Sequence, residues 1–285
     1  MSIPPAFPDI SKNVNNLINR DFYHLSKAAL DVKTKAPNGV AFAFKAKTGK
    51  DDSISSNIET KFTDKANGLT LTQGWNTANA LDTKVELVDT LSPGLKAEVL
   101  TSVVPNGSKA AKLNLYFSQP KVNVRAFFDL LKGPTFAGDF TVGHEGYVAG
   151  SEVGYDISGG KVTRLAVSTG YIHPTYAVGV NASKNFSVFT ASYFHKVSSL
   201  VEAGAKATYD VNAGASKPVG VEFAAKYALD PTAFVKGKLA DSGLAAVAYS
   251  QQLRPGVTLG VGLGFDALRL AEPVHKIGFS LSFAA

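Results

Sequence analysis

The chain has 285 residues, of which 18% are charged, and 29 basic against 23 acidic side chains give a net charge of +6. A hydrophobic share of 45% is too high for a disordered chain, whereas the charged share lies below the roughly 25% of an ordinary soluble domain. Because the sequence contains no cysteine, disulfides, thiolate metal sites and cysteine nucleophiles are excluded.

The first twenty residues follow the 3.6-residue period of an amphipathic helix. One helical face carries the apolar side chains of Phe7, Ile10, Val14, Leu17 and Ile18. Prolines at positions 4, 5 and 8 predict that the helix begins at about residue 8, because proline is tolerated only in the first turn. The segment lacks the basic start and the long apolar core of a secretory signal, so we expect no cleaved export signal.

From about residue 28 onward, apolar and polar positions alternate with the two-residue period of β-strands. Val40, Phe42 and Phe44 show this pattern early in the chain, and residues 277–283 show it near the end. Asn-Gly and Pro-Gly pairs separate the runs at short intervals, which predicts antiparallel hairpins. A strand with its turn takes about 13 or 14 residues, so we predict about nineteen strands. We expect an N-terminal segment at residues 1–26 and one all-β domain at residues 27–285.

A membrane β-barrel fits this alternation better than a soluble β-sandwich. A soluble protein of this length is expected to split into two domains, whereas no linker or shift in composition divides this chain. The polar faces are rich in Gly, Ala, Ser and Thr, unlike a solvent-exposed exterior. In lipid a sheet must close on itself, because every backbone N–H and C=O needs a partner within the protein. The sequence therefore predicts a barrel whose apolar face meets lipid and whose polar face surrounds a lumen.

The lumen of such a barrel has room for the amphipathic segment, since roughly sixteen to eighteen strands already leave an aqueous channel. We expect the apolar helical face to pack on the inner wall, with Lys12 and Arg20 towards the lumen.

Basic side chains along the lumen favour the passage of anions. Alternation assigns thirteen basic residues to the lumen wall, namely Lys33, Lys35, Lys45, Lys61, Lys84, Lys96, Lys112, Arg125, Arg164, Lys206, Lys226, Lys236 and Lys238. Acidic residues share these faces, and salt water screens charges beyond about 8 Å, so we expect only weak anion selectivity. The residues that we expect to contact nucleotides and to respond to voltage are Lys12, Arg20, Lys61, Lys84 and Lys96.

Four segments carry a family resemblance. They are Trp75–Thr77, Gly94–Lys96, His144–Gly146 and the long stretch Tyr227–Tyr249. Together and in this order they resemble the mitochondrial porins, the voltage-dependent anion channels of the mitochondrial outer membrane, and they are most similar to fungal members. The closing strand is similar to the sorting signal of mitochondrial barrels, at Lys276, Gly278, Leu281 and Phe283.

This resemblance implies a nineteen-stranded barrel whose first and last strands are parallel, with the amphipathic helix inside the lumen. It implies a voltage-gated, weakly anion-selective channel that passes ATP, ADP, phosphate, small metabolites and ions. The implied partners are membrane lipids and the import and barrel-assembly machinery of the outer membrane. A homo-oligomer is compatible with the resemblance, which implies neither a cofactor nor a nucleic acid.

Two positions depart from animal members of the family. Asp21–His24 stands where those members have a glycine-rich hinge, so gating by a flexible hinge is not expected here. Gln73 stands where many of them have a lipid-facing glutamate. Alternation places Gln73 on the lipid face, where a neutral amide is less costly than a carboxylate.

Other functions fit the sequence less well. The alternating glycines Gly260, Gly262 and Gly264 have no helix after them, as a dinucleotide loop would require, and His144-Glu145 lacks the second histidine of a zinc site. We therefore expect no enzyme, no cofactor and no metal site. The alternatives are a protein-translocating barrel of the same superfamily, a bacterial-type porin, which would need an export signal, and a soluble β-sheet lipid carrier.

Overall fold

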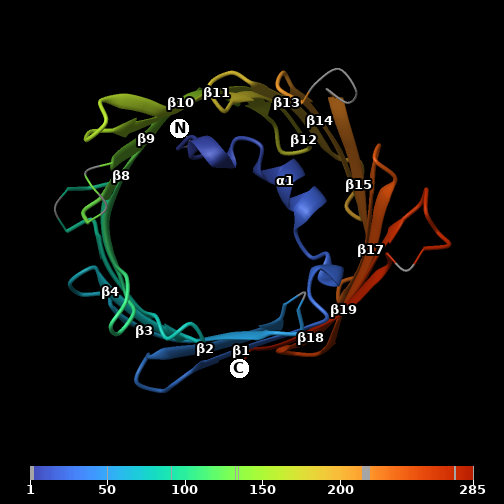
Figure 1. Cartoon of the computed structure of the whole chain (residues 1–285), viewed down its shortest axis with the longest axis horizontal. Helices are drawn as coiled ribbons and strands as arrows, with labels where there is room; N and C mark the ends of the chain where they lie inside the picture. Colours follow the sequence, from blue (N-terminus) through green and yellow to red (C-terminus); the bar gives the residue numbers. More distant parts are fainter. Residues whose placement is uncertain are drawn as a thin grey trace.

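Strands dominate the structure, which is a computed structural model that describes residues 3–49, 51–90, 92–131, 133, 135–213, 219–272 and 274–284. Nineteen strands in these residues form one sheet that closes around the N-terminal segment (Figure 1). Among the described residues, no helix has the length and apolar character needed to cross a membrane.

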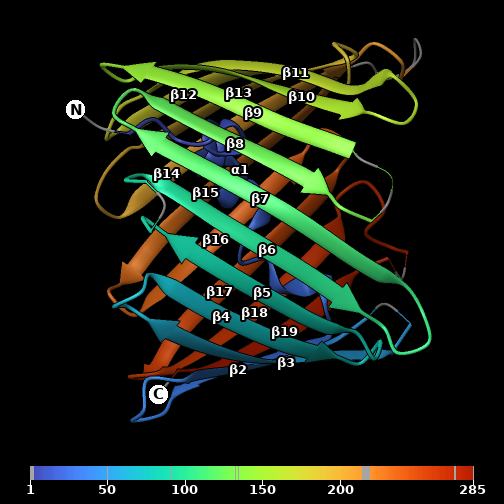
Figure 2. The same ribbon diagram turned by 90° about the vertical axis from the view of Figure 1, so that its left-hand side faces the viewer.

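The strands contain 8 to 12 residues each, which matches the length of tilted membrane-spanning strands. Their bounds are β1 Ala28–Lys35, β2 Ala41–Thr48, β3 Ile54–Asp64, β4 Leu69–Asn76, β5 Leu81–Val88, β6 Leu95–Val103, β7 Lys109–Gln119, β8 Val122–Asp129, β9 Thr135–His144, β10 Tyr147–Asp156, β11 Lys161–Ile172, β12 Tyr176–Ser183, β13 Val188–Lys196, β14 Val201–Asp210, β15 Val219–Asp230, β16 Ala233–Ala240, β17 Leu244–Arg254, β18 Val257–Asp266 and β19 Lys276–Ala284. Figure 2 shows that they run at a common slant around the barrel.

The barrel closes through a parallel pair of strands. Each strand is antiparallel to the next along the chain, whereas β1 and β19 pair in parallel from Ala28↔Phe279 to Lys33↔Ala284. Parallel closure follows from the odd number of strands, because strands that alternate in direction leave the first and the nineteenth pointing the same way. The predicted barrel of nineteen strands with parallel first and last strands is confirmed.

The ladder of strand pairs fixes which side chains face inward. Gly204 of β14 contacts the N-terminal helix, so every second residue from it faces the lumen, and the strand register carries this assignment around the wall. The other set faces outward and exposes large apolar side chains such as Leu71, Trp75, Val180 and Phe189. An exposed apolar surface that encircles a closed barrel is the surface that hydrocarbon stabilises.

The N-terminal segment consists of three short helical pieces, namely the 3-10 turn η1 Phe7–Asp9, the α-helix α1 Lys12–Asn19 and the 3-10 turn η2 Tyr23–Leu25. The α-helix thus begins at Lys12, later than the predicted start at about residue 8. The reason is Ser11, whose φ of −104° and ψ of 24° interrupt the helical backbone between η1 and α1.

Candidate functional site

The N-terminal segment lies along part of the inner wall (Figure 1). η1 contacts β9 and β10, α1 contacts β13, β14 and β15, and η2 contacts β17, β18 and β19. The wall formed by β2 to β8 lies across the lumen from it (Figure 1). The lumen therefore has one side covered by the segment and one side lined by strands.

Apolar side chains attach the segment to the wall. Those of the predicted helical face are all buried, namely Phe7, Ile10, Val14, Leu17 and Ile18. The first two pack with Val148 and Ala166, and the last three pack with Ala224 and Phe194. The helical face predicted from the sequence is thus the face that meets the wall.

Close packing holds η2 and the residues before it, at the position where the sequence predicts no flexible hinge. Phe22 is buried against Ala246 and Ala248 of β17. A Cβ atom on Gly262 of β18 would lie 2.5 Å from the backbone nitrogen of His24, so only glycine leaves room for this approach. The residues in place of the glycine-rich hinge are therefore packed on the wall.

His24 is a titratable group of this packed turn. Burial lowers the pKa of His24 below its ordinary value of 6.5, and the cations of Lys238 and Lys276 lower it further. Its Nδ1 is buried without a hydrogen-bond partner among the described residues. The neutral imidazole is therefore the form that the docked segment favours.

Lys12 and Arg20 point away from the wall into the lumen. Their side chains are 58% and 73% exposed. The Nζ of Lys12 lies 3.4 Å from Oδ1 of Asp9, and the Nε of Arg20 lies 3.8 Å from Oδ1 of Asp21. Exposed pairs of this kind are weak, so both cations stay accessible from the lumen.

The ladder places the predicted lumen cations on inward-facing positions of their strands. These are Lys33, Lys35, Lys45, Lys61, Lys84, Lys96, Lys112, Arg125, Arg164, Lys206, Lys226, Lys236 and Lys238. Their surroundings differ, and most of them fall into three groups according to their partners.

The first group forms an ion-pair cluster on β5 and β6. The Nζ of Lys96 lies 2.8 Å from Glu86 and 2.6 Å from Glu98, and the Nζ of Lys84 lies 3.2 Å from Glu86. The hydroxyl of Tyr116 donates a hydrogen bond of 2.9 Å to Glu98. Two ammonium groups thus face two carboxylates, and the cluster has little net charge.

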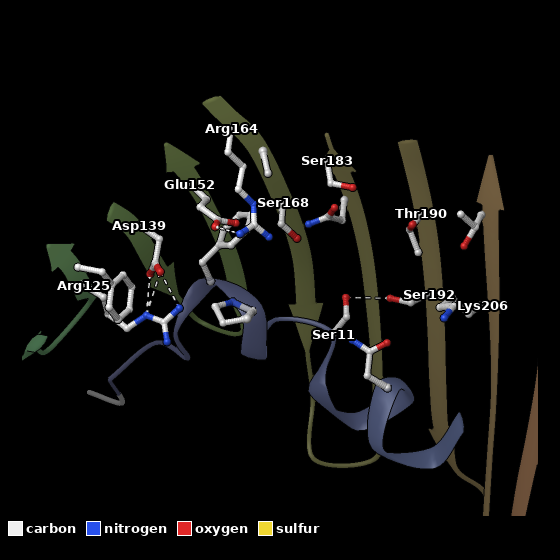
Figure 3. Close-up of a pocket in the computed structure, with 17 residues that line it drawn as sticks. Ser11, Arg125, Asp139, Glu152, Arg164, Ser168, Ser183, Thr190, Ser192 and Lys206 are labelled. Carbon is white, nitrogen blue, oxygen red and sulfur yellow. Dashed lines mark hydrogen bonds and ion pairs between the residues drawn. The ribbon is translucent and has the colours of Figure 1, made fainter. Parts of the chain in front are cut away.

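The second group pairs with acids beneath the segment (Figure 3). The guanidinium of Arg125 donates to both carboxylate oxygens of Asp139, with the shortest contact at 2.6 Å. Arg164 lies 3.0 Å from Glu152. These pairs line a cavity of about 490 Å³ between the segment and the wall, and at this cavity the hydroxyl of Ser192 donates to that of Ser11 at 3.1 Å. Polar and apolar side chains both line the cavity, and its cations are paired with carboxylates.

Lys206 and Lys33 are also paired, at 2.8 Å from Glu222 and 3.1 Å from Asp31. Lys226 lies over the ring of Phe234, 4.6 Å from its centre.

The third group is free of acidic partners. Among the described residues, no carboxylate oxygen lies within 4.0 Å of the Nζ atoms of Lys35, Lys45, Lys61 and Lys112. All four are exposed, and they belong to β1, β2, β3 and β7. The lumen lysines without an acidic partner therefore lie on strands other than those that carry the segment, and they outnumber the inward-facing acids Glu59 and Asp82 on the same side.

Lys236 and Lys238 of β16 face inward but lie at the segment. Lys236 is 3% exposed and contacts the end of α1, and the Nζ of Lys238 lies 4.7 Å from the centre of the Phe22 ring. Lys236 is therefore covered, although alternation alone assigns it to the open lumen.

Two further sequence predictions concern residues of β4 and β19. Gln73 of β4 is exposed on the outer face, between Leu71 and Trp75. On β19, Lys276 and Gly278 face inward, whereas Leu281 and Phe283 face outward. No three His, Asp or Glu side chains in the described ranges lie together as metal ligands would.

Asp139 is a residue that the sequence reasoning missed. It is buried and directly opposite Arg125 in the β8–β9 ladder. The turn after residue 129 is the sequence feature that could have indicated this pair, because the length of a hairpin turn determines which residues face each other across the two strands.

Comparison with known proteins covers nearly the whole chain. The eukaryotic porin family matches residues 3–278. The mitochondrial outer membrane protein porin of Candida albicans is 61% identical over 99% of this chain and 99% of its own length. The protein of the same name from Neurospora crassa is 52% identical over 98% of each chain. Non-selective voltage-gated ion channel 1 of Saccharomyces cerevisiae is 49% identical over 99% of each.

A solved structure shares the architecture at low identity. A mutant of the Rh. blastica porin superposes with a TM-score of 0.52 at 9% identity, over 85% of this chain and 91% of that one. This likeness concerns the fold alone. The match to the family and to its fungal members extends over the barrel and the segment within it, and the chain belongs to the eukaryotic porin family.

Proposed function

We propose that this chain is a voltage-gated channel of the mitochondrial outer membrane that passes small metabolites and ions, with a weak preference for anions. The observation that carries the proposal is the difference between the two sides of the lumen. One side is covered by a docked amphipathic segment, and the other exposes Lys35, Lys45, Lys61 and Lys112 without acidic partners. Since ion pairs neutralise many of the other cations, the excess positive potential is small and the preference weak.

The chain works in this proposal as two parts, the pore-associated segment of residues 1–26 and the barrel of residues 27–285. The division is supported by β1, which begins at Ala28, and by the buried apolar face of the segment. Displacement of the segment by voltage would change the open cross-section without unfolding the barrel.

ATP, ADP, phosphate and other small anions are the proposed permeants. Of the residues predicted to contact nucleotides, Lys12, Arg20 and Lys61 are exposed to the lumen, and we assign them the contact with phosphate groups. Lys84 and Lys96 form ion pairs with Glu86 and Glu98, so we assign them an effect on the electrostatic potential of the lumen and no direct contact with phosphate. No enzymatic step is part of this function.

The outer face defines the proposed partners. Its apolar side chains meet membrane lipids, and Gln73 places a neutral amide among them. We propose that Lys276, Gly278, Leu281 and Phe283 are read as a sorting signal by the import and barrel-assembly machinery before β19 pairs with β1. A homo-oligomer through the outer face is compatible with these contacts.

The test is the reversal potential of the channel in a planar bilayer across a salt gradient. Lys61→Glu and Lys112→Glu each replace an unpaired lumen cation, and each should shift the reversal potential towards cation preference. Lys184→Glu makes the same change in charge at a turn residue with a φ of 51°, outside the strands, and should shift it much less. Equal shifts from all three variants, or none, would contradict the proposed selectivity.

A further inference from the structure

The C-terminal end of α1 is held by a buried cation on the wall. The Nζ of Lys236 donates hydrogen bonds of 2.8 Å to the backbone oxygen of Asn16 and of 2.8 Å to that of Arg20. It also lies 3.9 Å from Oδ2 of Asp21. The Asn16 oxygen already accepts the backbone N–H of Arg20, so Lys236 is its second donor. The carbonyls here also lie at the negative end of the helix dipole, which an ammonium group stabilises.

The aromatic ring that follows completes this site. The Nζ of Lys236 lies 5.2 Å from the centre of the buried Phe22 ring, and Lys238 lies 4.7 Å from the same centre. Contacts from residues 16 to 22 thus converge on one ammonium group, which is 3% exposed. A charge buried to this degree needs such partners, because an unpaired buried charge strongly destabilises a fold.

The backbone beside Lys236 is constrained as well. Asp21 adopts a φ of 61°, in the left-handed region that side-chain-bearing residues rarely enter. Such a conformation persists where the surroundings over-determine it. Here the Arg20 carbonyl is fixed by Lys236 on one side of Asp21, and the ring of Phe22 is buried on the other.

We propose that Lys236 is the anchor that positions the N-terminal segment for gating, and that displacement of the segment uncovers its charge in the lumen. While α1 is docked, the ammonium group is covered and adds little to ion selectivity. When the segment leaves, the four contacts break together and a cation becomes exposed on β16. Movement of the segment and the potential of the lumen are therefore coupled through one side chain. The gating part of this inference rests on the proposed function.

The docking of the segment can be measured without passing current. Because the chain has no cysteine, Val14→Cys provides a single thiol on the buried face of α1. Its rate of reaction with a membrane-impermeant maleimide, in protein reconstituted in nanodiscs, reports how often the segment leaves the wall. Lys236→Met removes the anchor, and Lys226→Met removes the cation that lies directly opposite on β15.

We expect Lys236→Met to accelerate labelling about tenfold or more, since charge-assisted hydrogen bonds of a buried group are lost. Lys226→Met should leave the rate within about twofold of the parent, because Lys226 interacts with Phe234 of the wall and makes no hydrogen bond or ion pair to the described residues of the segment. Lys236→Arg, which keeps charge and donors, should restore much of the protection. If Lys236→Met does not assemble, Lys236→Gln carries the same expectation. An unchanged labelling rate in the folded variant would overturn the inference that Lys236 anchors the segment.

Bilayer recordings separate this inference from the proposed function. In the open state, Lys236→Met should keep the parental reversal potential, whereas its closing voltage should fall. A large loss of anion preference in the open state would show that Lys236 is already exposed, and would overturn the inference. If no variant conducts, the proposed function fails, while the labelling rates still decide whether Lys236 anchors the segment.

Discussion

Ile18 is the most completely buried side chain of the segment, at 0% exposed, and its truncation is the sharpest test of apolar docking. Ile18→Ala removes three carbon groups, and at about 0.8 kcal/mol for each group the loss is about 2 kcal/mol. Apolar side chains line the space that is left, so an empty cavity would add to this loss and about 2 kcal/mol is the lower figure. A loss of about 2 kcal/mol raises the undocked fraction about 30-fold, since about 1.4 kcal/mol corresponds to a factor of ten.

The assay is maleimide labelling of Val14→Cys, compared with and without Ile18→Ala. When the segment opens and closes faster than the thiol reacts, the labelling rate follows the undocked fraction, so we expect an increase of about 30-fold. Asn13→Ala, at an exposed position of α1, is the control and should change the rate less than about threefold. If Ile18→Ala accelerates labelling no more than Asn13→Ala does, the apolar face does not hold the segment.

Three further predictions concern the other contacts of the segment and the wall. Gly262→Val places a side chain against the backbone of His24 and should loosen the segment, so trypsin should cleave after position 20 faster than in the parent. Gly220→Val is the control, because a Cβ atom there meets nothing within 4 Å and cleavage should stay slow. Burial lowers the pKa of His24, so docking is strongest above pH 6.5, where the exposed imidazole is also neutral, and weakens as the pH falls below it. The labelling rate at position 14, divided by the rate of the same thiol in the denatured chain at the same pH, should therefore rise on acidification, because this ratio removes the pH dependence of the thiolate itself. His24→Phe should abolish the rise. Asp139→Asn leaves Arg125 without its carboxylate, so the free energy of unfolding should fall by about 2 kcal/mol in urea titrations, and an Arg125→Gln change in the same chain should add much less than it does alone.

The fold could be predicted from the sequence because alternation is a local signal. A one-residue change of register reverses the faces of a whole strand, so runs such as Val40, Phe42 and Phe44 determine inside and outside without any knowledge of neighbours. The amphipathic face of the segment was equally readable, since the 3.6-residue period places Val14 and Ile18 on one side.

The partners of the lumen cations could not be read in the same way. Whether Arg125 meets Asp139 depends on the exact length of a turn, and whether Lys236 is covered depends on a segment 216 residues away along the chain. Both are properties of tertiary packing, which no local pattern encodes. For the same reason the break of the helix at Ser11 was not predicted, and the α-helix begins at Lys12 instead of at about residue 8.

The central claim is that the apolar faces of the strands meet lipid while the polar faces enclose a water-filled pore. A voltage ramp on the purified chain in a planar lipid bilayer tests this claim most directly. The account predicts stepwise conductance that falls at higher voltage of either sign. A chain that is folded and monodisperse in buffer without detergent, and that passes no current in the bilayer, would contradict it.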